Sequence, residues 1–176
     1  QGAGRPLLGI ATGTGLRAPP DEGTTAIWDA VALTSSQVLG HTQDQRRRAI
    51  ILLTDGLDTS SRVKRSYAIE QVLGAEAVVY AIGIGDKKGE GVNKGALREV
   101  AERTGGRAFF PQKAGDLEAA FREIESELRT QYLIAYSSTN KRRDGTYRRI
   151  TVEITNPELK KVGLQLRHRP GYFARR

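Results

Sequence analysis

The chain has 176 residues and is 38% hydrophobic, which suits one domain with an apolar core and argues against a disordered chain. It has no Cys, so disulfides, thiolate zinc sites and Cys nucleophiles are excluded. No stretch approaches the ~18 consecutive apolar residues of a membrane span, and no signal-peptide core follows the first residues. The chain begins with Gln instead of Met, which predicts a processed or truncated product.

Basic residues outnumber acidic ones, with 28 Lys and Arg against 20 Asp and Glu and a net charge of +8. Such an excess can indicate a polyanionic partner. The basic residues gather in segments 46–48, 141–143, 148–149 and 167–176, where we expect loops or strand edges, and no aromatic residues are interleaved with them. We therefore predict a solvated charged surface and no nucleic-acid binding.

Gly and Pro interrupt every periodic pattern in residues 1–22, so this segment is predicted to be mostly loop. Within it, residues 6–11 have the composition of a short strand. After this segment, helical and apolar patterns alternate along the chain, as expected of the helices and strands of an α/β domain.

The first helix is predicted to run from a cap at Thr24 or Thr25 to about Leu39, with Gly40 ending it. The continuously apolar residues 49–54 then predict a strand that is buried on both faces of a parallel sheet.

Two further units of helix and strand follow. A helix over residues 63–73, closed by Gly74, leads to a second buried strand over residues 77–82. Residues 96–103 predict a short helix, and residues 107–110 predict a short strand.

The clearest amphipathic helix is predicted to begin at a cap formed by Asp116. Its apolar side chains fall on one stripe, formed by Leu117, Phe121, Ile124 and Leu128.

After residue 130 the pattern changes from helical to alternating, which predicts an antiparallel meander with one apolar face. Its three strands cover residues 131–137, 150–154 and 162–166. The aromatic residues of this region are Tyr132, Tyr136, Tyr147, Tyr172 and Phe173. They either form an exposed binding patch or fill the core between the meander and the preceding helix, and core filling is the favoured interpretation.

These patterns predict an α/β fold with three layers, in which a mostly parallel, Rossmann-like sheet has helices on both faces and an antiparallel β meander follows at the C-terminus. The predicted organisation is a loop-rich segment at residues 1–22, an α/β domain at residues 23–130 and an antiparallel extension packed on it at residues 131–176.

Asp55 stands directly after the predicted strand at residues 49–54. Open α/β sheets bind ligands outside the carboxyl ends of their strands, so a carboxylate at this point is well placed for function. Taken alone, Asp55 and Gly56 form an ordinary turn dipeptide.

Four segments resemble, in order and spacing, the von Willebrand factor type A (VWA) domain family. They are residues 23–30, 53–56, 80–85 and 101–110. The resemblance covers residues 23–128 and implies the Rossmann-like fold of that family. Residues 127–136 and 169–173 are similar to a narrower set, the VWA-related proteins typical of Acidobacteria, which implies a secreted or envelope-associated bacterial protein.

The resemblance also implies a metal-ion-dependent adhesion site (MIDAS), which the family builds from an Asp-x-Ser-x-Ser loop, a Thr and an Asp. Thr25 matches that Thr and Asp55 matches that Asp, with Asp58 and Gly56 at the rim or in the surrounding layer. Their carboxylate and hydroxyl oxygens suit Mg²⁺, or Mn²⁺ or Ca²⁺, and an acidic residue of a protein ligand would add to the coordination.

The Asp-x-Ser-x-Ser segment has no match in residues 1–24, and residues 58–61 do not replace it because their spacing differs. We therefore expect an N-terminally incomplete fold that binds metal weakly or not at all. The strand at residues 49–54 would have an unpaired edge, which leads to self-association unless a partner, a preceding segment or residues 6–11 cover it.

The predicted function is a non-enzymatic protein-binding or adhesion-like module. Two alternatives remain, namely a metal-independent scaffold that binds an anionic partner through its basic surface, and a metal-assisted hydrolase that uses Asp55. His41 and His168 are far apart and no nucleophile-base pair is evident, so no catalytic residue is assigned. Residues 83–91 lack the Lys-Ser/Thr of a phosphate-binding loop.

Overall fold

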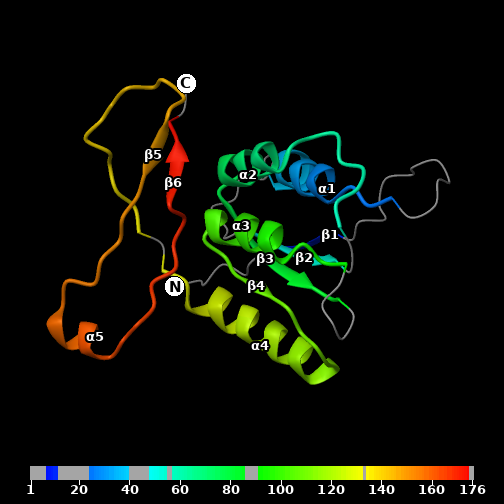
Figure 1. The fold of residues 1–176 in the computed structure, drawn as a ribbon. Helices are drawn as coiled ribbons and strands as arrows, with labels where there is room; N and C mark the ends of the chain where they lie inside the picture. The colour runs from blue at the N-terminus through cyan, green and yellow to red at the C-terminus, as the bar shows by residue number, and fades with distance from the viewer. Residues whose placement is uncertain are drawn as a thin grey trace.

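The main sheet has four parallel strands in a computed structural model that describes residues 7–11, 24–39, 48–54, 57–85, 91–132 and 134–174. In spatial order they are β1 (Leu7–Ala11), β2 (Arg48–Thr54), β3 (Ala77–Gly83) and β4 (Ala108–Phe109). Figure 1 shows them side by side in the middle of the molecule. The buried strands predicted at residues 49–54 and 77–82 are confirmed, and β4 lies within the predicted residues 107–110.

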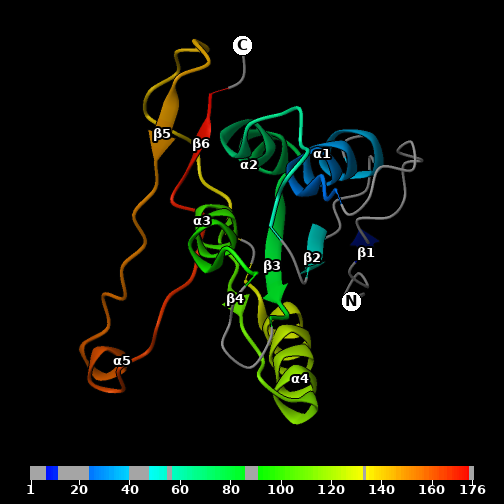
Figure 2. The ribbon, with the colours of Figure 1, turned by 45° about the vertical axis from the view of Figure 1, so that its right-hand side comes forward.

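Helices cover both faces of this sheet (Figure 1, Figure 2). On one face lie α1 (Ile27–Leu33), its continuation as the π-helix η1 (Thr34–Leu39), α2 (Arg65–Gly74) and α3 (Lys94–Thr104). The other face is covered by α4 (Ala114–Thr130). The predicted three-layer α/β architecture is confirmed.

The strands are continuously apolar because their side chains alternate between two cores. Ile50, Leu52 and Val79 pack in the core with α1, α2 and α3. The intervening residues Ile51 and Tyr80 pack in the second core beneath α4. Since successive side chains point to opposite faces of a sheet, a strand covered on both sides needs an apolar residue at nearly every position.

Strand β1 covers the edge of β2. It pairs in parallel with β2 from Leu7 opposite Arg48 to Ala11 opposite Leu52. Of the three ways in which this apolar edge was expected to be covered, the structure therefore shows the one that uses residues 6–11. The strand that pairs with this edge of β2 therefore belongs to the same chain.

The helix boundaries follow local hydrogen bonding. Helix α3 begins before the predicted residues 96–103, because the Asn93 side chain caps it by accepting a hydrogen bond from Ala96 N at 2.9 Å. It ends where Gly105 takes the left-handed conformation, with φ of 87°. The predicted end of the first helix at Gly40 lies outside the described residues.

Helix α4 differs from its prediction in two details. It begins at Ala114, and Asp116 lies in its first turn, where the carboxylate accepts a hydrogen bond from Gln112 N at 3.1 Å. Phe121 is 42% exposed, so its place in the buried stripe was wrong. Ala120 is buried instead, together with the residues at later turns of the same stripe, Ile124 and Leu128, and Leu117 packs at their edge.

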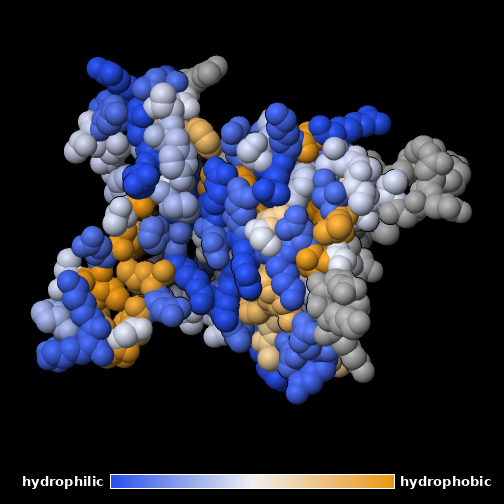
Figure 3. Space-filling view, viewed as in Figure 1, coloured by the Kyte–Doolittle hydropathy of each residue, from blue (hydrophilic) through white to orange (hydrophobic). Residues whose placement is uncertain are grey.

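The C-terminal region forms a separate antiparallel sheet, as its alternating pattern predicted, but with other boundaries. Its strands are β5 (Tyr147–Arg149) and β6 (Gly171–Phe173). Among the described residues, none of the predicted segments 131–137, 150–154 and 162–166 forms a strand, which corrects the three-stranded meander. Val162 and Leu164 are 68% and 50% exposed, and Figure 3 shows apolar surface around this part of the molecule.

A short helix replaces the turn that a meander requires. In α5 (Pro157–Lys161), Pro157 occupies the first turn and the Asn156 side chain accepts a hydrogen bond from Glu158 N at 2.9 Å. These are strong helix-start signals. The helix lies between the segments predicted as the second and third strands, and the described residues show no ladder between them.

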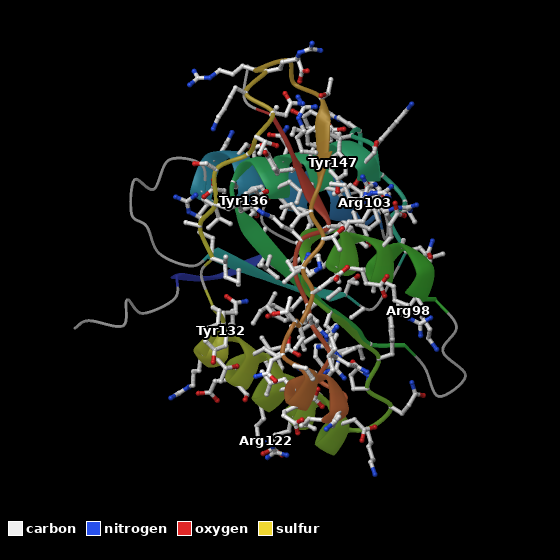
Figure 4. The ribbon with its side chains drawn as sticks, turned by 90° about the vertical axis from the view of Figure 1, so that its left-hand side faces the viewer. Arg98, Arg103, Arg122, Tyr132, Tyr136 and Tyr147 are labelled. Carbon is white, nitrogen blue, oxygen red and sulfur yellow. The ribbon has the colours of Figure 1, made fainter. Side chains whose placement is uncertain are left out.

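The aromatic residues of this region do not fill a core, which corrects the favoured interpretation. Tyr132 is 93% exposed and Tyr136 is 56% exposed, and Figure 4 shows both at the surface of the chain that leads to the C-terminal sheet. Tyr147 and Phe173 contact each other edge to face, with ring centroids 5.2 Å apart. In the part of the chain that is described, no helix is long and apolar enough to cross a membrane.

We predict that Gly106→Ala destabilises the fold. A Cβ at Gly106 would overlap the carbonyl oxygen of Val79 in the centre of the sheet, and neither backbone can move freely. The expected loss is about 1–3 kcal/mol in the free energy of unfolding, measured by urea denaturation. Gly115→Ala is the matched control, since a Cβ there meets nothing within 4 Å and lies in helix α4, so that it stabilises by up to about 1 kcal/mol. Equal stabilities for the two variants would contradict the close packing at Gly106.

Candidate functional site

The candidate site lies where the start of α1 meets the loop at residues 57–63, which follows strand β2. Thr25 is bound to this loop through its backbone. Thr25 N donates to Thr59 Oγ1 at 2.8 Å, and Thr25 O accepts from Thr59 N at 2.9 Å and from Ser60 N at 3.2 Å. Because the loop begins shortly after Thr54, these bonds hold Thr25 at the carboxyl end of β2.

The loop also caps α1. Asp58 Oδ1 accepts hydrogen bonds from Ile27 N at 2.8 Å and from Trp28 N at 3.4 Å. Ser61 Oγ accepts from Trp28 N at 2.9 Å and from Asp29 N at 3.2 Å, and its own hydroxyl donates to Asp58. The Asp58 carboxylate therefore stabilises the start of α1 in two ways. It accepts hydrogen bonds from the first amides, and its negative charge interacts favourably with the positive end of the helix dipole.

The predicted caps at Thr24 and Thr25 are therefore wrong. The residue before the helix is Ala26, and no side chain caps the helix from that position. The orphan amides of the first turn are instead satisfied from residues more than 30 positions later in the chain. Asp, Ser and Thr are common capping residues, but a sequence pattern reveals them only when they stand immediately before the helix they cap.

Side chains of α1 also bind the loop at residues 57–63. The Asp29 carboxylate accepts hydrogen bonds from Arg62 N at 3.0 Å and from Val63 N at 2.9 Å. The Arg65 guanidinium lies 5.7 Å from the centroid of the Trp28 ring, a cation-π distance. Helix α1 and the loop thus hold each other through side chains of both.

The metal ligands predicted from the family resemblance are only partly visible. Asp55 and Gly56 lie outside the described residues. Thr25 forms its hydrogen bonds through its backbone, so within the described structure its hydroxyl is not engaged. The Asp58 carboxylate, predicted at the rim, already binds the amides of α1 and the Ser61 hydroxyl.

The described residues do not fit a complete metal site. They contain no group of three or more His, Asp or Glu side chains placed to hold a metal ion. The Thr25 hydroxyl is a single neutral oxygen, and Mg²⁺ requires an octahedral shell that usually includes a carboxylate. The described side chains therefore support no metal-dependent reaction step.

Among the described residues, the two groups with the largest pKa shifts lie elsewhere. Burial beneath α4 and the charge of Glu127 raise the pKa of Tyr80 to about 12, and Gln131 Nε2 donates to its oxygen at 3.4 Å. Hydrogen bonds from Thr146 and contact with Arg148 lower the pKa of Asp144 to about 2. Both groups hold structural elements together, Tyr80 in the core and Asp144 in the turn before β5.

We predict that Asp58→Ala lowers the free energy of unfolding by about 1–2 kcal/mol, because the first amides of α1 lose their acceptor. Asp58→Asn keeps a side-chain oxygen and should lose less. Urea denaturation measures both. Glu118→Ala serves as control, since it removes a carboxylate that forms an exposed ion pair with Arg122, worth less than about 1 kcal/mol. If Asp58→Ala is no less stable than Glu118→Ala, the cap does not support the helix.

Comparison with known proteins identifies the family. The model of the von Willebrand factor type A domain matches residues 16–123, which includes β2, β3, β4 and helices α1 to α3. A search of curated proteins found no match. A similar solved structure, described as an uncharacterized membrane spanning protein from Vibrio fischeri, has 24% identity and a TM-score of 0.43, and the match covers 58% of this chain and 56% of that one. The present chain thus spans about half the length of that protein. With the matched segment including most of the main sheet and the candidate site, the chain belongs to the von Willebrand factor type A domain family, whose members are in general protein-interaction modules.

Proposed function

We propose that this chain is a non-enzymatic module that binds a protein ligand at the carboxyl end of β2, with Thr25 and Asp55 as its central polar residues. The observation that supports this most directly is the clamp on Thr25, whose backbone is held by Thr59 and Ser60 while its hydroxyl is not used by the described part of the fold. A hydroxyl that the described fold does not use, on a residue whose backbone is held in place, is suited to bind a ligand.

The proposed role of Thr25 and Asp55 extends to a divalent cation, Mg²⁺ or alternatively Mn²⁺ or Ca²⁺. Thr25 would contribute a hydroxyl and Asp55 a carboxylate, both hard oxygen ligands. A bound cation would supply positive charge to attract an acidic side chain of the partner. With two protein ligands the expected affinity is low.

Ser61 and Asp58 are the pair in this loop that most resembles a catalytic nucleophile and base, but their contacts argue against catalysis. Ser61 and Asp58 are hydrogen-bonded, as a nucleophile and a base would be. However, Ser61 Oγ also accepts two amide hydrogens of α1, and Asp58 Oδ1 accepts a further two. Both side chains are used to cap the helix. The described part of this loop therefore has no free base beside a free nucleophile.

The alternative of an anionic partner bound by the basic surface has less support. Many of the basic side chains form ion pairs within the chain, among them Arg65 with Glu99, Arg107 with Glu123, Arg122 with Glu118, Arg129 with Glu125 and Arg167 with Glu127. These pairs reduce the charge that is available to a polyanion.

We predict weak binding of Mn²⁺, detected by its effect on water proton relaxation, that Asp55→Ala and Thr25→Ala abolish and Thr25→Ser retains. The two Thr25 variants differ in the side-chain hydroxyl, which Thr25→Ser keeps and Thr25→Ala removes. Both keep the backbone hydrogen bonds that hold residue 25, so a difference in binding reports on the hydroxyl. Mg²⁺ should compete for the same site.

Glu118→Ala is the matched control for the loss of one carboxylate far from the site. Retention of Mn²⁺ binding in Asp55→Ala would refute the cation role of these residues. If the Thr25 variants also left the affinity for an acidic protein ligand unchanged, the proposed binding surface itself would be wrong.

A further inference from the structure

Strand β5 has one paired edge and one open edge. Its pairing with β6 continues past the strand ends through hydrogen bonds from Ile150 N to Pro170 O at 2.8 Å and from Ala174 N to Thr146 O at 3.0 Å. In an antiparallel ladder, successive residues direct their backbone groups to alternate sides. The backbone groups of Arg149 and Thr151 therefore point away from β6, toward an edge where the described residues place no other strand.

The segment after β5 continues this edge. Side-chain exposure alternates through residues 149–155, with Ile150, Val152 and Ile154 half-buried and Arg149, Thr151, Glu153 and Thr155 exposed. Such alternation is typical of an extended strand. Within the described structure, the backbone of residues 151–155 forms no hydrogen bond with another segment.

The apolar side of this segment is incompletely covered by its own chain. Val152 and Ile154 line an open hollow of about 390 Å³ together with Leu164 and Leu166, which are 50% and 47% exposed, and Glu153 and Lys160 also line it. Figure 3 shows this apolar surface in the lobe that contains α5. Figure 4 views the same lobe from its outer side, with β5 and the following segment in front of β6.

We propose that residues 147–155 pair with the same residues of a second copy of this chain, antiparallel and about a two-fold axis at Thr151. Odd-numbered residues present their backbone groups at the open edge, so odd-numbered residues must lie opposite one another in hydrogen-bonded pairs. Centring on Thr151 places Arg149 of each copy opposite Glu153 of the other. The same register places Ile150 opposite Val152.

Complementary charges favour a second copy of this chain as the pairing partner. Charged residues on an open edge normally prevent pairing with other strands. Here the two-fold arrangement forms two Arg149-Glu153 pairs between the copies, and opposite charges across strands are stabilising. The two-stranded sheet, which is marginal on its own, becomes a continuous four-stranded sheet with a longer apolar face.

This pairing is independent of the proposed ligand site, because residues 147–155 are remote in the sequence from Thr25 and Asp55 and lie in the separate C-terminal sheet. Loss of cation binding would leave it intact, and loss of pairing would leave cation binding intact.

Sedimentation equilibrium of the whole chain tests the proposal. We expect a reversible, concentration-dependent dimer. Arg149→Glu alone or Glu153→Arg alone should weaken dimerisation at least about tenfold, because each places like charges opposite one another twice. The double variant Arg149→Glu/Glu153→Arg should restore it. Arg143→Glu is the control, with the same change in charge in the loop before β5.

A backbone variant tests the same register without a change in charge. Thr151→Pro removes the amide at the two-fold axis, which has no partner in the described structure of one copy, and should abolish the dimer while leaving the melting temperature of the monomer unchanged. Hydrogen exchange should show Arg149, Thr151 and Glu153 amides protected only at high protein concentration. A chain that stays monomeric, or single charge variants that the double variant does not rescue, would overturn the proposal.

Discussion

The unpaired amides at the start of α1 are the constraint on which the candidate site depends. A helix begins with N–H groups that have no intrahelical acceptor, and leaving them unsatisfied beside a packed core is costly. Asp58 and Ser61 satisfy them from the loop that follows β2. Because the acceptors belong to that loop, the capping interaction also determines where the helix starts relative to the carboxyl end of the sheet. The position of Thr25 is a consequence of how the helix is capped.

The same interaction divides the acidic residues of this region between two tasks. Asp58 and Asp29 accept backbone amides in opposite directions across the junction, so their charge supports the fold. The hydrogen bonds of Asp58 go to its Oδ1. The Thr25 hydroxyl, by contrast, has no hydrogen bond within the described residues, which is why the proposed ligand site is centred on it. The oxygen-rich sequence at residues 58–61 is thus used for capping α1 and for binding the Thr25 backbone.

The elements predicted well from the sequence are those whose signals are local. The apolar runs of β2 and β3 require burial on both faces, and Gly105 ends α3 through its own backbone conformation. The cap of α1 was missed because its acceptors lie more than 30 residues away. In the C-terminal region, the strand predicted at residues 150–154 was misplaced, since β5 covers Tyr147–Arg149. The alternation reflects side-chain exposure after β5, and alternation does not determine which residues pair with another strand. Asn156 and Pro157 start a short helix between the two apolar segments of this region, where the predicted meander needed a turn.

The edge of β2 is covered by another strand, whereas the outer edge of β5 has no strand beside it among the described residues. The side chains of the two strands explain this difference. Strand β2 is apolar toward both faces, so an exposed edge would carry a wide apolar surface, and β1 covers it within the chain. The segment after β5 alternates between apolar residues (Ile150, Val152 and Ile154) and exposed polar residues, and a strand with one polar face tolerates water on that face. The C-terminal sheet is held to the body by close contacts elsewhere, since a Cβ at Gly105 would lie 2.8 Å from the backbone nitrogen of Arg169, and Arg167 pairs with Glu127 of α4. These contacts hold the segment before β6 against the α/β body. The described residues place no strand on the outer edge of β5, which is the edge where we propose that a second copy pairs.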